Sequence, residues 1–249
     1  MQIKIKGLVI REKPKGENGK LLTLLTDTSG IINVNAKGVR KISAAYLKSA
    51  QLFAFSDFVL YEKNGFYTLI EASLVTDFFH IREDLDSYSL ACYICEAASA
   101  FVGDGESGAR LLRLTLNTLF AIENSTLPHK QIKACFELRL CAESGFAPET
   151  EVCGVCSEPV EGSCLFDIAG GTAVCRECTP NAPETVLLNE NLLLAVRHIT
   201  GSEPRKFLSF RIGERDLYTL CDLSERYFLS RAERGFSTLA FYKQCEELK

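Results

Sequence analysis

The chain carries the stretch Cys153-Gly-Val-Cys156 and, eighteen residues further on, the stretch Cys175-Arg-Glu-Cys178. Two Cys-x-x-Cys pairs at this separation are typical of a structural zinc site. Four thiolates complete the tetrahedral shell of a zinc ion and leave no position for a catalytic water. Gly154 would allow the unusual backbone angles of a tight turn. The stretch therefore predicts one structural Zn2+ held by Cys153, Cys156, Cys175 and Cys178, in a zinc-binding insertion at residues 150–182.

Two alternatives to this ligand set are compatible with the sequence. The four thiols can match the pattern without binding a metal, and Cys164, which lies between the pairs, could compete as a fourth ligand. Cys164 lacks a Cys-x-x-Cys partner, which favours the two pairs as the ligands. Gly162, Gly170 and Gly171 suit the reversal of a small hairpin between the pairs.

The first 80 residues show the pattern of a small β-barrel. Ile3 and Ile5 alternate with lysines, which is the period of a half-buried strand, and Gly7 marks a bend or bulge. Asn64-Gly65 is a strong hairpin signal because both residues tolerate positive φ. Five strands are expected at residues 2–13, Leu21–Thr26, Ile31–Ala36, Leu52–Tyr61 and Phe66–Ala72, with a short helix near Ser43–Ser49. This order matches an OB-fold, although another small barrel with no nucleic-acid role would show the same periodicity.

Beyond about Ile81 the pattern becomes helical. Helices are expected at Ser87–Val102, Ala109–Glu123, His129–Ser144, Asn189–Ile199, Arg205–Leu220 and Ser224–Leu229. The fold class is therefore predicted as α+β. A five-stranded OB-fold β-barrel at residues 1–80 precedes a helical domain at residues 81–249, and the zinc insertion interrupts the helical domain.

Charge is distributed unevenly along the chain. Residues 1–80 contain eleven Lys/Arg and seven Asp/Glu, which gives +4, and the remaining residues contain seventeen and twenty-five, which gives −8. An anionic partner would thus be expected at the N-terminal end. No long uncharged apolar run and no signal peptide is visible. Eleven cysteines, an odd number, favour reduced thiols over a disulfide framework, so a cytoplasmic protein is expected.

The strongest basic cluster is Ala36-Lys-Gly-Val-Arg-Lys41 at the end of the third strand. On an OB-fold such a loop lies near the groove that holds a nucleic-acid strand, so its cations could contact phosphates. The predicted DNA contacts are Lys37, Arg40 and Lys41, with Lys4, Lys6, Arg11 and Lys20 as weaker candidates. Stacking on bases could involve Tyr46, Phe53, Phe55 or Phe66. The alternative is a solvated basic loop with no ligand.

Two glycine-rich stretches partly match nucleotide-binding motifs. Gly103-Asp-Gly-Glu-Ser-Gly108 fits a dinucleotide fingerprint, but it follows an expected helix rather than a strand and would place acids beside a pyrophosphate. Residues 16–21 lack the first glycine of a P-loop and its Ser/Thr. Both stretches are interpreted as loops.

Nothing in the sequence assembles a catalytic site. The three histidines are far apart and in no ligand spacing. Cys92 and Cys95 form a Cys-x-x-Cys that would be redox-active at a helix N-terminus, but they fall inside an apolar helical run, where buried thiols are the better interpretation. The protein is therefore not expected to be an enzyme.

Taken together, the chain resembles the bacterial recombination-mediator family RecO over essentially its whole length. The resemblance rests on the loop Ala36–Lys41, on Phe136-Glu-Leu-Arg-Leu140, and on Gly145-Phe-Ala-Pro-Glu149 directly ahead of the first cysteine pair. The last of these is the most specific. The C-terminal part from about Ser224 adds little to it.

The resemblance implies a nucleoid-associated DNA repair protein without a catalytic site. RecO-like proteins bind single- and double-stranded DNA, anneal complementary strands and act with the partner RecR. They also bind the C-terminal tail of single-strand binding protein and help a recombinase replace it. Lys37, Arg40 and Lys41 match the family's DNA-contacting loop. Lys133 and Arg139 are the candidates for the tail, which as an acidic peptide would need cations beside an apolar pocket.

Two other functions remain open from the sequence. The first is a protein–protein adaptor, for example in transcription, that has the same barrel and zinc module. Such an adaptor would not bind single-stranded DNA in an electrophoretic mobility-shift assay. The second is a thiol-redox enzyme using Cys92 and Cys95, which requires a low pKa at one of these thiols.

Overall fold

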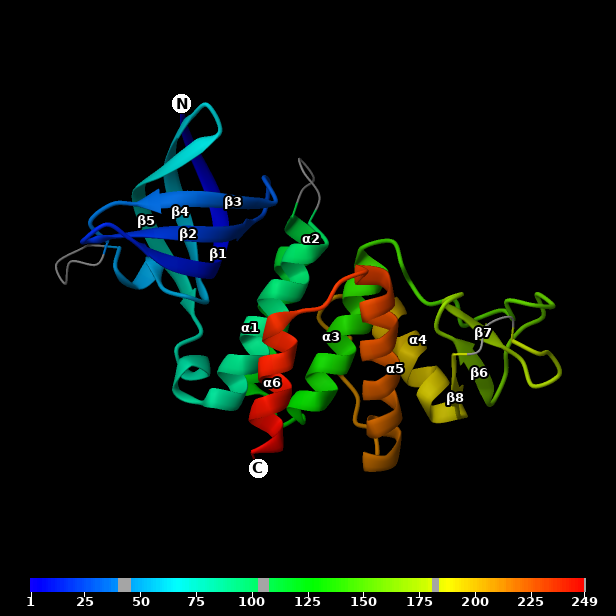
Figure 1. Ribbon diagram of the computed structural model, residues 1–249. Helices are drawn as coiled ribbons and strands as arrows, with labels where there is room; N and C mark the ends of the chain where they lie inside the picture. Colours follow the sequence, from blue (N-terminus) through cyan, green and yellow to red (C-terminus); the bar gives the residue numbers. More distant parts are fainter. Residues whose placement is uncertain (40–45, 103–107, 181–183, 249) are drawn as a thin grey trace. The chain divides into compact units, whose positions relative to one another are not determined.

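The computed structural model describes residues 1–39, 46–102, 108–180 and 184–248 (Figure 1). The chain divides into two compact units. The first contains Met1–Glu123 and Thr238–Lys249, and the second contains Asn124–Ser237.

The first unit begins with a closed five-stranded barrel. Its strands are β1 (Gln2–Lys15), β2 (Gly19–Thr26), β3 (Ile31–Ala36), β4 (Ala54–Lys63) and β5 (Phe66–Asp77), in the order β1-β2-β3-β5-β4. Closure depends on β1, which pairs with β4 along its first half and with β2 along its second half. The predicted OB-fold barrel is confirmed.

The bend in β1 has two parts. Gly7 pairs with both neighbouring strands, and a Cβ there would lie 3.4 Å from side-chain atoms of Leu24 and Thr26. The shift in register comes later, between Val9 and Arg11, which is a β-bulge at Ile10. The sequence placed the irregularity at Gly7, whereas the pairing changes three residues further on.

Apolar side chains fill the interior of the barrel. They include Val9, Leu22, Val34, Phe58 and Leu60, all buried. Of the helix expected near Ser43–Ser49, residues 43–45 lie outside the described residues. The described part contains only a turn and the short 3-10 helix η1 (Lys48–Ala50).

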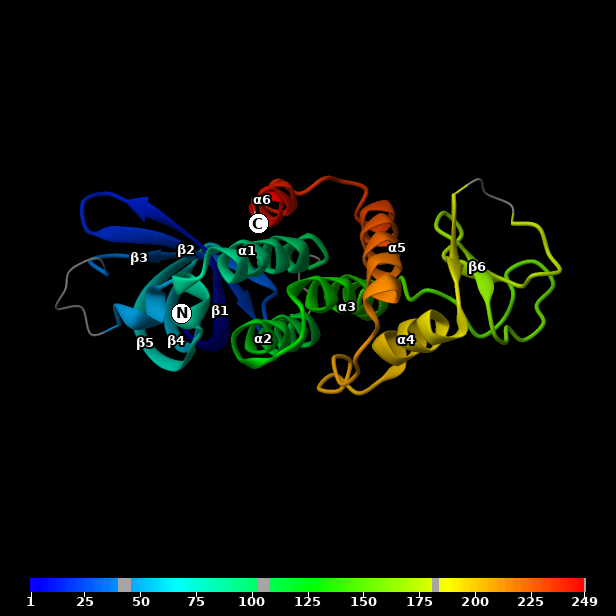
Figure 2. The ribbon, with the colours of Figure 1, turned by 90° about the horizontal axis from the view of Figure 1, so that it is seen from below.

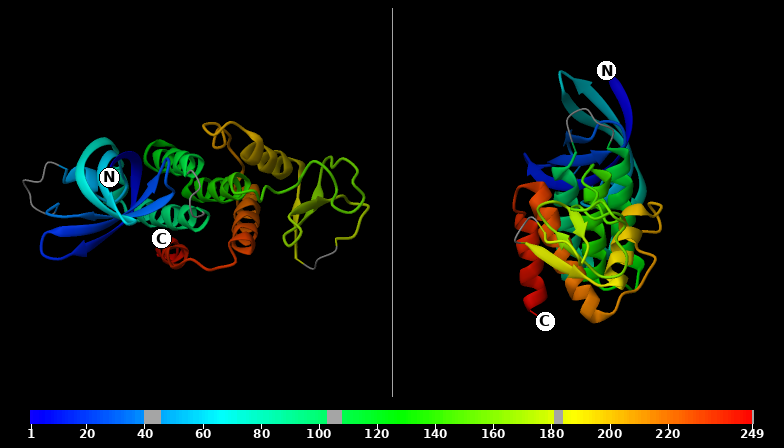
Figure 3. Two further views of the ribbon diagram at one scale, coloured as in Figure 1. Left: turned by 90° about the horizontal axis from the view of Figure 1, so that it is seen from above. Right: turned by 90° about the vertical axis from the view of Figure 1, so that its right-hand side faces the viewer.

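Helices complete the first unit. After the short helix η2 (His80–Glu83) come α1 (Leu85–Ala100) and α2 (Ala109–Asn124), and α6 (Ser237–Glu247) returns to α1 at the end of the chain (Figure 3). The Glu96 carboxylate of α1 accepts hydrogen bonds from the backbone N–H and the hydroxyl of Thr238, which fixes the first turn of α6. A Cβ on Gly108 would lie 2.4 Å from the carbonyl oxygen of Thr26, so this glycine permits close packing of α2 on the barrel.

The second unit is built on α3 (His129–Glu143), whose residues Gln131–Cys141 are all buried. It packs against α4 (Glu190–Gly201) and α5 (Glu214–Ala232). A three-stranded antiparallel sheet, with strands β6 (Cys164–Asp167), β7 (Thr172–Val174) and β8 (Thr185–Leu188) in the order β7-β6-β8, completes the unit (Figure 2).

The predicted helices are confirmed up to α4, whereas the C-terminal part was wrong in detail. Residues 205–213 are turns and irregular chain, and α5 is one continuous helix rather than two. It ends where Glu233 adopts a left-handed φ of 51°. Helix α6 and strand β8 were not predicted. Among the described residues no helix is both long and apolar enough to cross a membrane.

Candidate metal centre and barrel surface

The sulfur atoms of Cys153, Cys156, Cys175 and Cys178 lie within 4.8 Å of one another. The sulfurs of Cys156 and Cys175 are 3.8 Å apart. A tetrahedron with Zn–S bonds of about 2.3 Å has edges of about 3.8 Å, so the donor set fits a tetrahedral ion. Among the described residues this is the group of Cys, His, Asp and Glu side chains that could hold a metal, and it does not include Cys164. The predicted ligand set is thus assembled by the fold.

Local geometry prepares the first cysteine as a ligand. The backbone N–H groups of Val155 and Cys175 each donate to the Cys153 sulfur at 3.4 Å. Burial raises the pKa of the Cys153 thiol. Backbone hydrogen bonds from Cys156, Cys175 and Val155 lower it by more than burial raises it, so the pKa falls to about 6. The thiolate that a metal requires is therefore favoured here before any ion binds.

Gly154 serves packing rather than an unusual backbone angle. Its φ is not positive, but a Cβ at this position would lie 2.4 Å from Thr172 Oγ1 on the adjacent strand β7. The left-handed residue of the turn is Ser157, with φ of 64°. The predicted hairpin is confirmed as β6–β7, turning at Gly171 with φ of 70°.

The four cysteines and the three-stranded sheet belong to one segment, residues 149–188, which we call the metal module. Two arginines attach this module to the helices. Arg197 of α4 donates to the carbonyl oxygens of Thr150 and Val160. Arg231 of α5 donates to the carbonyl oxygens of Ile168 and Ala169 at 2.8 and 2.6 Å. Because both arginines bind main-chain atoms, the module is held at four points of its backbone.

A row of cations lies on the outer surface of β1, β2 and β3. Register places Arg11 opposite Thr23 and Lys13 opposite Leu21, and these side chains point away from the buried Leu22 and Leu24. The hydroxyl of Thr23 donates to Asn33 Oδ1 of β3 at 2.9 Å, on the same surface. We define the basic face as the exposed side chains of Arg11, Lys13, Lys15 and Lys37. Lys13 and Lys15 were missed, although their two-residue spacing from Arg11 could have indicated them.

Acidic side chains are absent from the outward positions of these three strands, all of whose residues are described. Glu12, the one acid within them, points to the other side and pairs with Lys20 at 2.7 Å. Lys20 Nζ also lies 3.4 Å from the carbonyl oxygen of Ala50. Lys20 is therefore held in internal contacts, in contrast to the exposed cations of the basic face.

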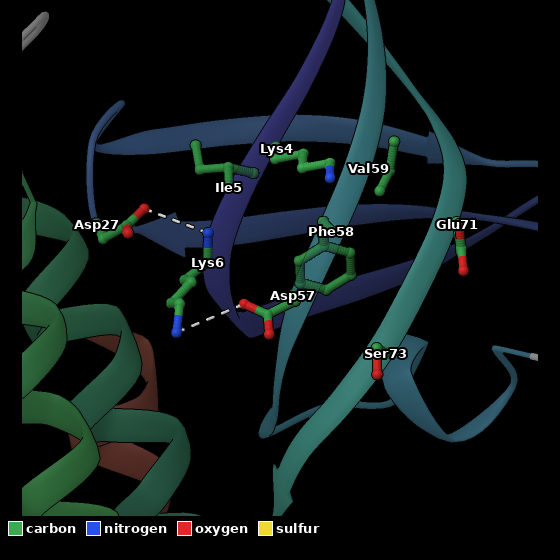
Figure 4. A pocket seen from close by; sticks show the side chains of 9 residues that line it. All are labelled: Lys4, Ile5, Lys6, Asp27, Asp57, Phe58, Val59, Glu71 and Ser73. Carbon is green, nitrogen blue, oxygen red and sulfur yellow. Dashed lines mark hydrogen bonds and ion pairs between the residues drawn. The ribbon is translucent and has the colours of Figure 1, made fainter.

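Lys4 and Lys6 lie on a different surface, formed by β1, β4 and β5 (Figure 4). Lys6 Nζ is 3.7 Å from Asp57 Oδ1, and Asp27 and Glu71 line the same shallow pocket. Two cations and three carboxylates give this surface a charge of −1. It is therefore less suited to phosphates than the basic face.

Of the four aromatic candidates, Phe66 is the most exposed, with 78% of its surface accessible, whereas Phe53 is fully buried. Tyr46 packs against the barrel core, and Phe55 is half-buried. Phe66 lies two residues before Thr68, which pairs with Asn35 of β3. It therefore borders the basic face. Arg40 and Lys41 lie outside the described residues, whereas Lys37 is exposed at the end of β3.

Lys133 and Arg139 do not form a cationic surface. Lys133 Nζ is 2.8 Å from Glu137 and 2.9 Å from Glu225, and its side chain is only 6% exposed. Arg139 pairs with Glu143 at 2.8 Å and donates to the carbonyl oxygens of Ile199, Thr200 and Ser202. Both are buried in the second unit, so their geometry argues against the predicted role in binding an acidic tail. Each of the two cations has an acid four residues further along the helix, Glu137 or Glu143, and this spacing indicates an ion pair but not burial.

The thiol-redox alternative gains no support. Burial raises the pKa of both Cys92 and Cys95, whereas a redox-active thiol has a lowered pKa. Residues 103–107 of the glycine-rich loop lie outside the described residues, and Gly108 is explained by packing on the barrel.

The fold defines a class of protein with an OB-fold barrel and a helical domain that carries a four-cysteine metal-binding module. Comparison with known protein families identifies both parts of this architecture. The model of the Recombination protein O N terminal family matches residues 1–78, and that of the Recombination protein O C terminal family matches residues 82–240. The chain belongs to the RecO family of DNA repair proteins.

Individual relatives cover nearly the whole chain. The DNA repair protein RecO of Acetivibrio thermocellus is 28% identical over 247 residues, which is 99% of this chain and 98% of the relative. That of Alkaliphilus metalliredigens is 26% identical over 245 residues, covering 98% of this chain and all of the relative. That of Dehalococcoides mccartyi is 28% identical over 218 residues, covering 87% and 85%.

Proposed function

We propose that this protein is a recombination mediator that binds single- and double-stranded DNA, anneals complementary strands and has no catalytic activity. With RecR, and through the tail of single-strand binding protein, it would help load a recombinase onto DNA. Family membership supports the repair role. The observation that carries DNA binding is the basic face, where Arg11, Lys13, Lys15 and Lys37 meet no outward acid within the three strands. A protein acting on chromosomal DNA would work at the nucleoid in the cytoplasm.

The proposed mechanism is neutralisation of phosphates without sequence readout. Outward residues two apart on a strand are on the order of 7 Å apart, so Lys13 and Lys15 can contact successive parts of one backbone. Phe66 at the border of this face offers a stacking surface that is tolerant of base identity. Holding two neutralised strands close together lowers their repulsion, which would promote annealing.

We propose that the metal is one zinc ion with a structural role. All four donors are cysteine sulfurs within 4.8 Å of one another, and a four-cysteine donor set is typical of closed zinc sites. The module contains three short strands and is held to the helices by Arg197 and Arg231. A segment of this size has too small a hydrophobic core to stay folded without a metal ion or another cross-link.

The basic face is tested by the triple variant Lys13→Ala/Lys15→Ala/Lys37→Ala. For single-stranded DNA each lost phosphate contact lowers the slope of log K against log[salt] by roughly 0.7, so the slope should fall by about 2. Affinity at 0.1 M salt should fall roughly 100-fold. The measurement is fluorescence anisotropy of a labelled oligonucleotide at salt concentrations from about 0.05 M to about 0.3 M.

The matched control is Lys4→Ala/Lys6→Ala, which removes cations of the same strand from the surface that carries Asp57 and Glu71. Its slope should change much less than that of the triple variant. Equal slopes for the triple variant and the wild type would show that DNA binds elsewhere. Annealing of strands coated with single-strand binding protein then separates a mediator from an adaptor, since an adaptor would neither shift single-stranded DNA nor anneal it.

A further inference from the structure

A pocket of about 590 Å3 lies inside the first unit, next to the basic face. One wall is the outer surface of the barrel, with Arg11, Thr23 and Asn33. The other wall is α1, whose residues Tyr88, Cys92, Glu96 and Ser99 recur at helical spacing on one side. The first turn of α6 adds Thr238. The volume is within the range of small-molecule sites.

The polar groups of the pocket suit a neutral heterocycle better than a phosphate. Glu96 on the helical wall is acidic and would repel a phosphate near α1, whereas the charge of Glu12 is neutralised by its ion pair with Lys20. Asn33 presents an amide, which pairs with base edges in nucleic-acid recognition. The ring of Tyr88 is held by an edge contact with the buried Phe53, with centroids 5.9 Å apart.

The entrance has the opposite character. Arg11 is exposed and belongs both to the pocket and to the basic face. The next outward cation on β1 is Lys13, two residues further along the strand. A polyanion lying on the basic face would therefore reach the pocket with a phosphate at Arg11, and the attached base would be directed toward Asn33 and α1.

We propose that this pocket receives one unpaired nucleotide of a single-stranded DNA bound to the basic face, with its base inside and its phosphate at Arg11. The proposal rests on the proposed DNA binding and goes beyond it. It predicts a source of single-strand preference, because a base paired in a duplex cannot enter while it stays paired.

Cys92 reports directly on occupancy, because it is half-buried in the helical wall. The rate of its alkylation by N-ethylmaleimide is measured by peptide mass spectrometry, with the protein saturated by a single-stranded oligonucleotide or by a blunt duplex. Saturation is established separately by anisotropy. The single strand should slow alkylation of Cys92 at least fivefold, while the duplex leaves it unchanged. Cys221 of α5, half-buried in the second unit, is the internal control.

Four outcomes decide the proposal. Slowing by single strand alone supports it. An unchanged rate at Cys92 with single strand bound overturns it and leaves the proposed function intact, and equal slowing by duplex overturns it as well, since mere coverage would explain the effect. If neither DNA binds, the proposed function and this inference both fail.

A pair of variants tests the base contact independently. Asn33→Ala should lower affinity for single-stranded DNA about tenfold with an unchanged salt slope, because the lost contact is to a neutral base. Asn35→Ala removes the next amide of the same strand, which does not line the pocket, and should lower affinity less. Equal effects of the two substitutions, or a reduced slope for Asn33→Ala, would contradict a base in the pocket.

Discussion

Removing the metal should unfold the module of residues 149–188 while the barrel stays folded. Structural zinc contributes an apparent binding free energy of about 10–16 kcal/mol at pH 7, far more than so small a segment gains from its own core. The double variant Cys175→Ser/Cys178→Ser should lose its zinc and become sensitive to protease between β6 and β8. Zinc content is measured by a colorimetric chelator after thiol modification, with about one ion expected per wild-type chain.

Acid should have the same effect as the double variant, because protons compete with the metal for the thiolates. Cys164→Ala is the matched control, since this buried cysteine lies within β6 of the same module but outside the metal cluster. It should retain the full zinc content. Cleavage of the barrel at the same rate as the module would show that the metal stabilises the whole chain. Loss of all DNA binding with the barrel still folded would move the DNA site to the module.

Replacing Lys133 by Met should destabilise the second unit by about 3–5 kcal/mol. The substitution removes the Lys133 amine from the carboxylate of Glu137, which has no exposed surface and accepts a hydrogen bond from the hydroxyl of Ser224 at 2.7 Å. An uncompensated buried carboxylate is costly, whereas the intact pair is neutralised. Chemical unfolding followed by far-ultraviolet circular dichroism measures the change, since the chain contains no tryptophan.

The control for this substitution is Lys130→Met, which removes an exposed lysine of the same helix and should change stability by less than about 0.5 kcal/mol. The pH dependence has a defined sign. Burial lowers the pKa of Lys133, but Glu137 and Glu225 raise it further, so the net pKa is raised. The stabilisation is therefore fully present at neutral pH and is lost only as alkaline pH rises through that pKa. Similar stability of Lys133→Met and Lys130→Met would show that the buried contacts contribute little.

Prediction from the sequence succeeded where the signal is local. Alternation in the first 80 residues and the Asn64-Gly65 turn indicated the strands of the barrel, because side-chain period and turn conformation are properties of a few neighbouring residues. It failed where tertiary contacts decide. Helix α6 carries a weak apolar pattern, and its first turn is fixed by Glu96, more than 100 residues earlier in the chain.

Lys133 illustrates the limit for surface residues. A lysine on an expected helix is normally solvated, and only the packing of α3 against α5 brings Glu225 to its amine. The cations of β1 illustrate the same point. The bulge at Ile10 shifts the alternation by one residue, so the cations at residues 4 and 6 before it and those at residues 11, 13 and 15 after it are all exposed. They lie on different surfaces because β1 pairs with β4 along its first half and with β2 along its second half.

The choice of Cys153, Cys156, Cys175 and Cys178 as metal ligands could be predicted from the sequence itself. The spacing within each pair lets both of its sulfurs reach one ion, and this depends on short-range chain geometry alone. The tertiary structure decided what surrounds them and which charges gather elsewhere. It placed Thr172 against Gly154, excluded Cys164 from the cluster, and buried Lys133 and Arg139. Such outcomes follow from packing between residues distant in the chain, and no local pattern encodes them.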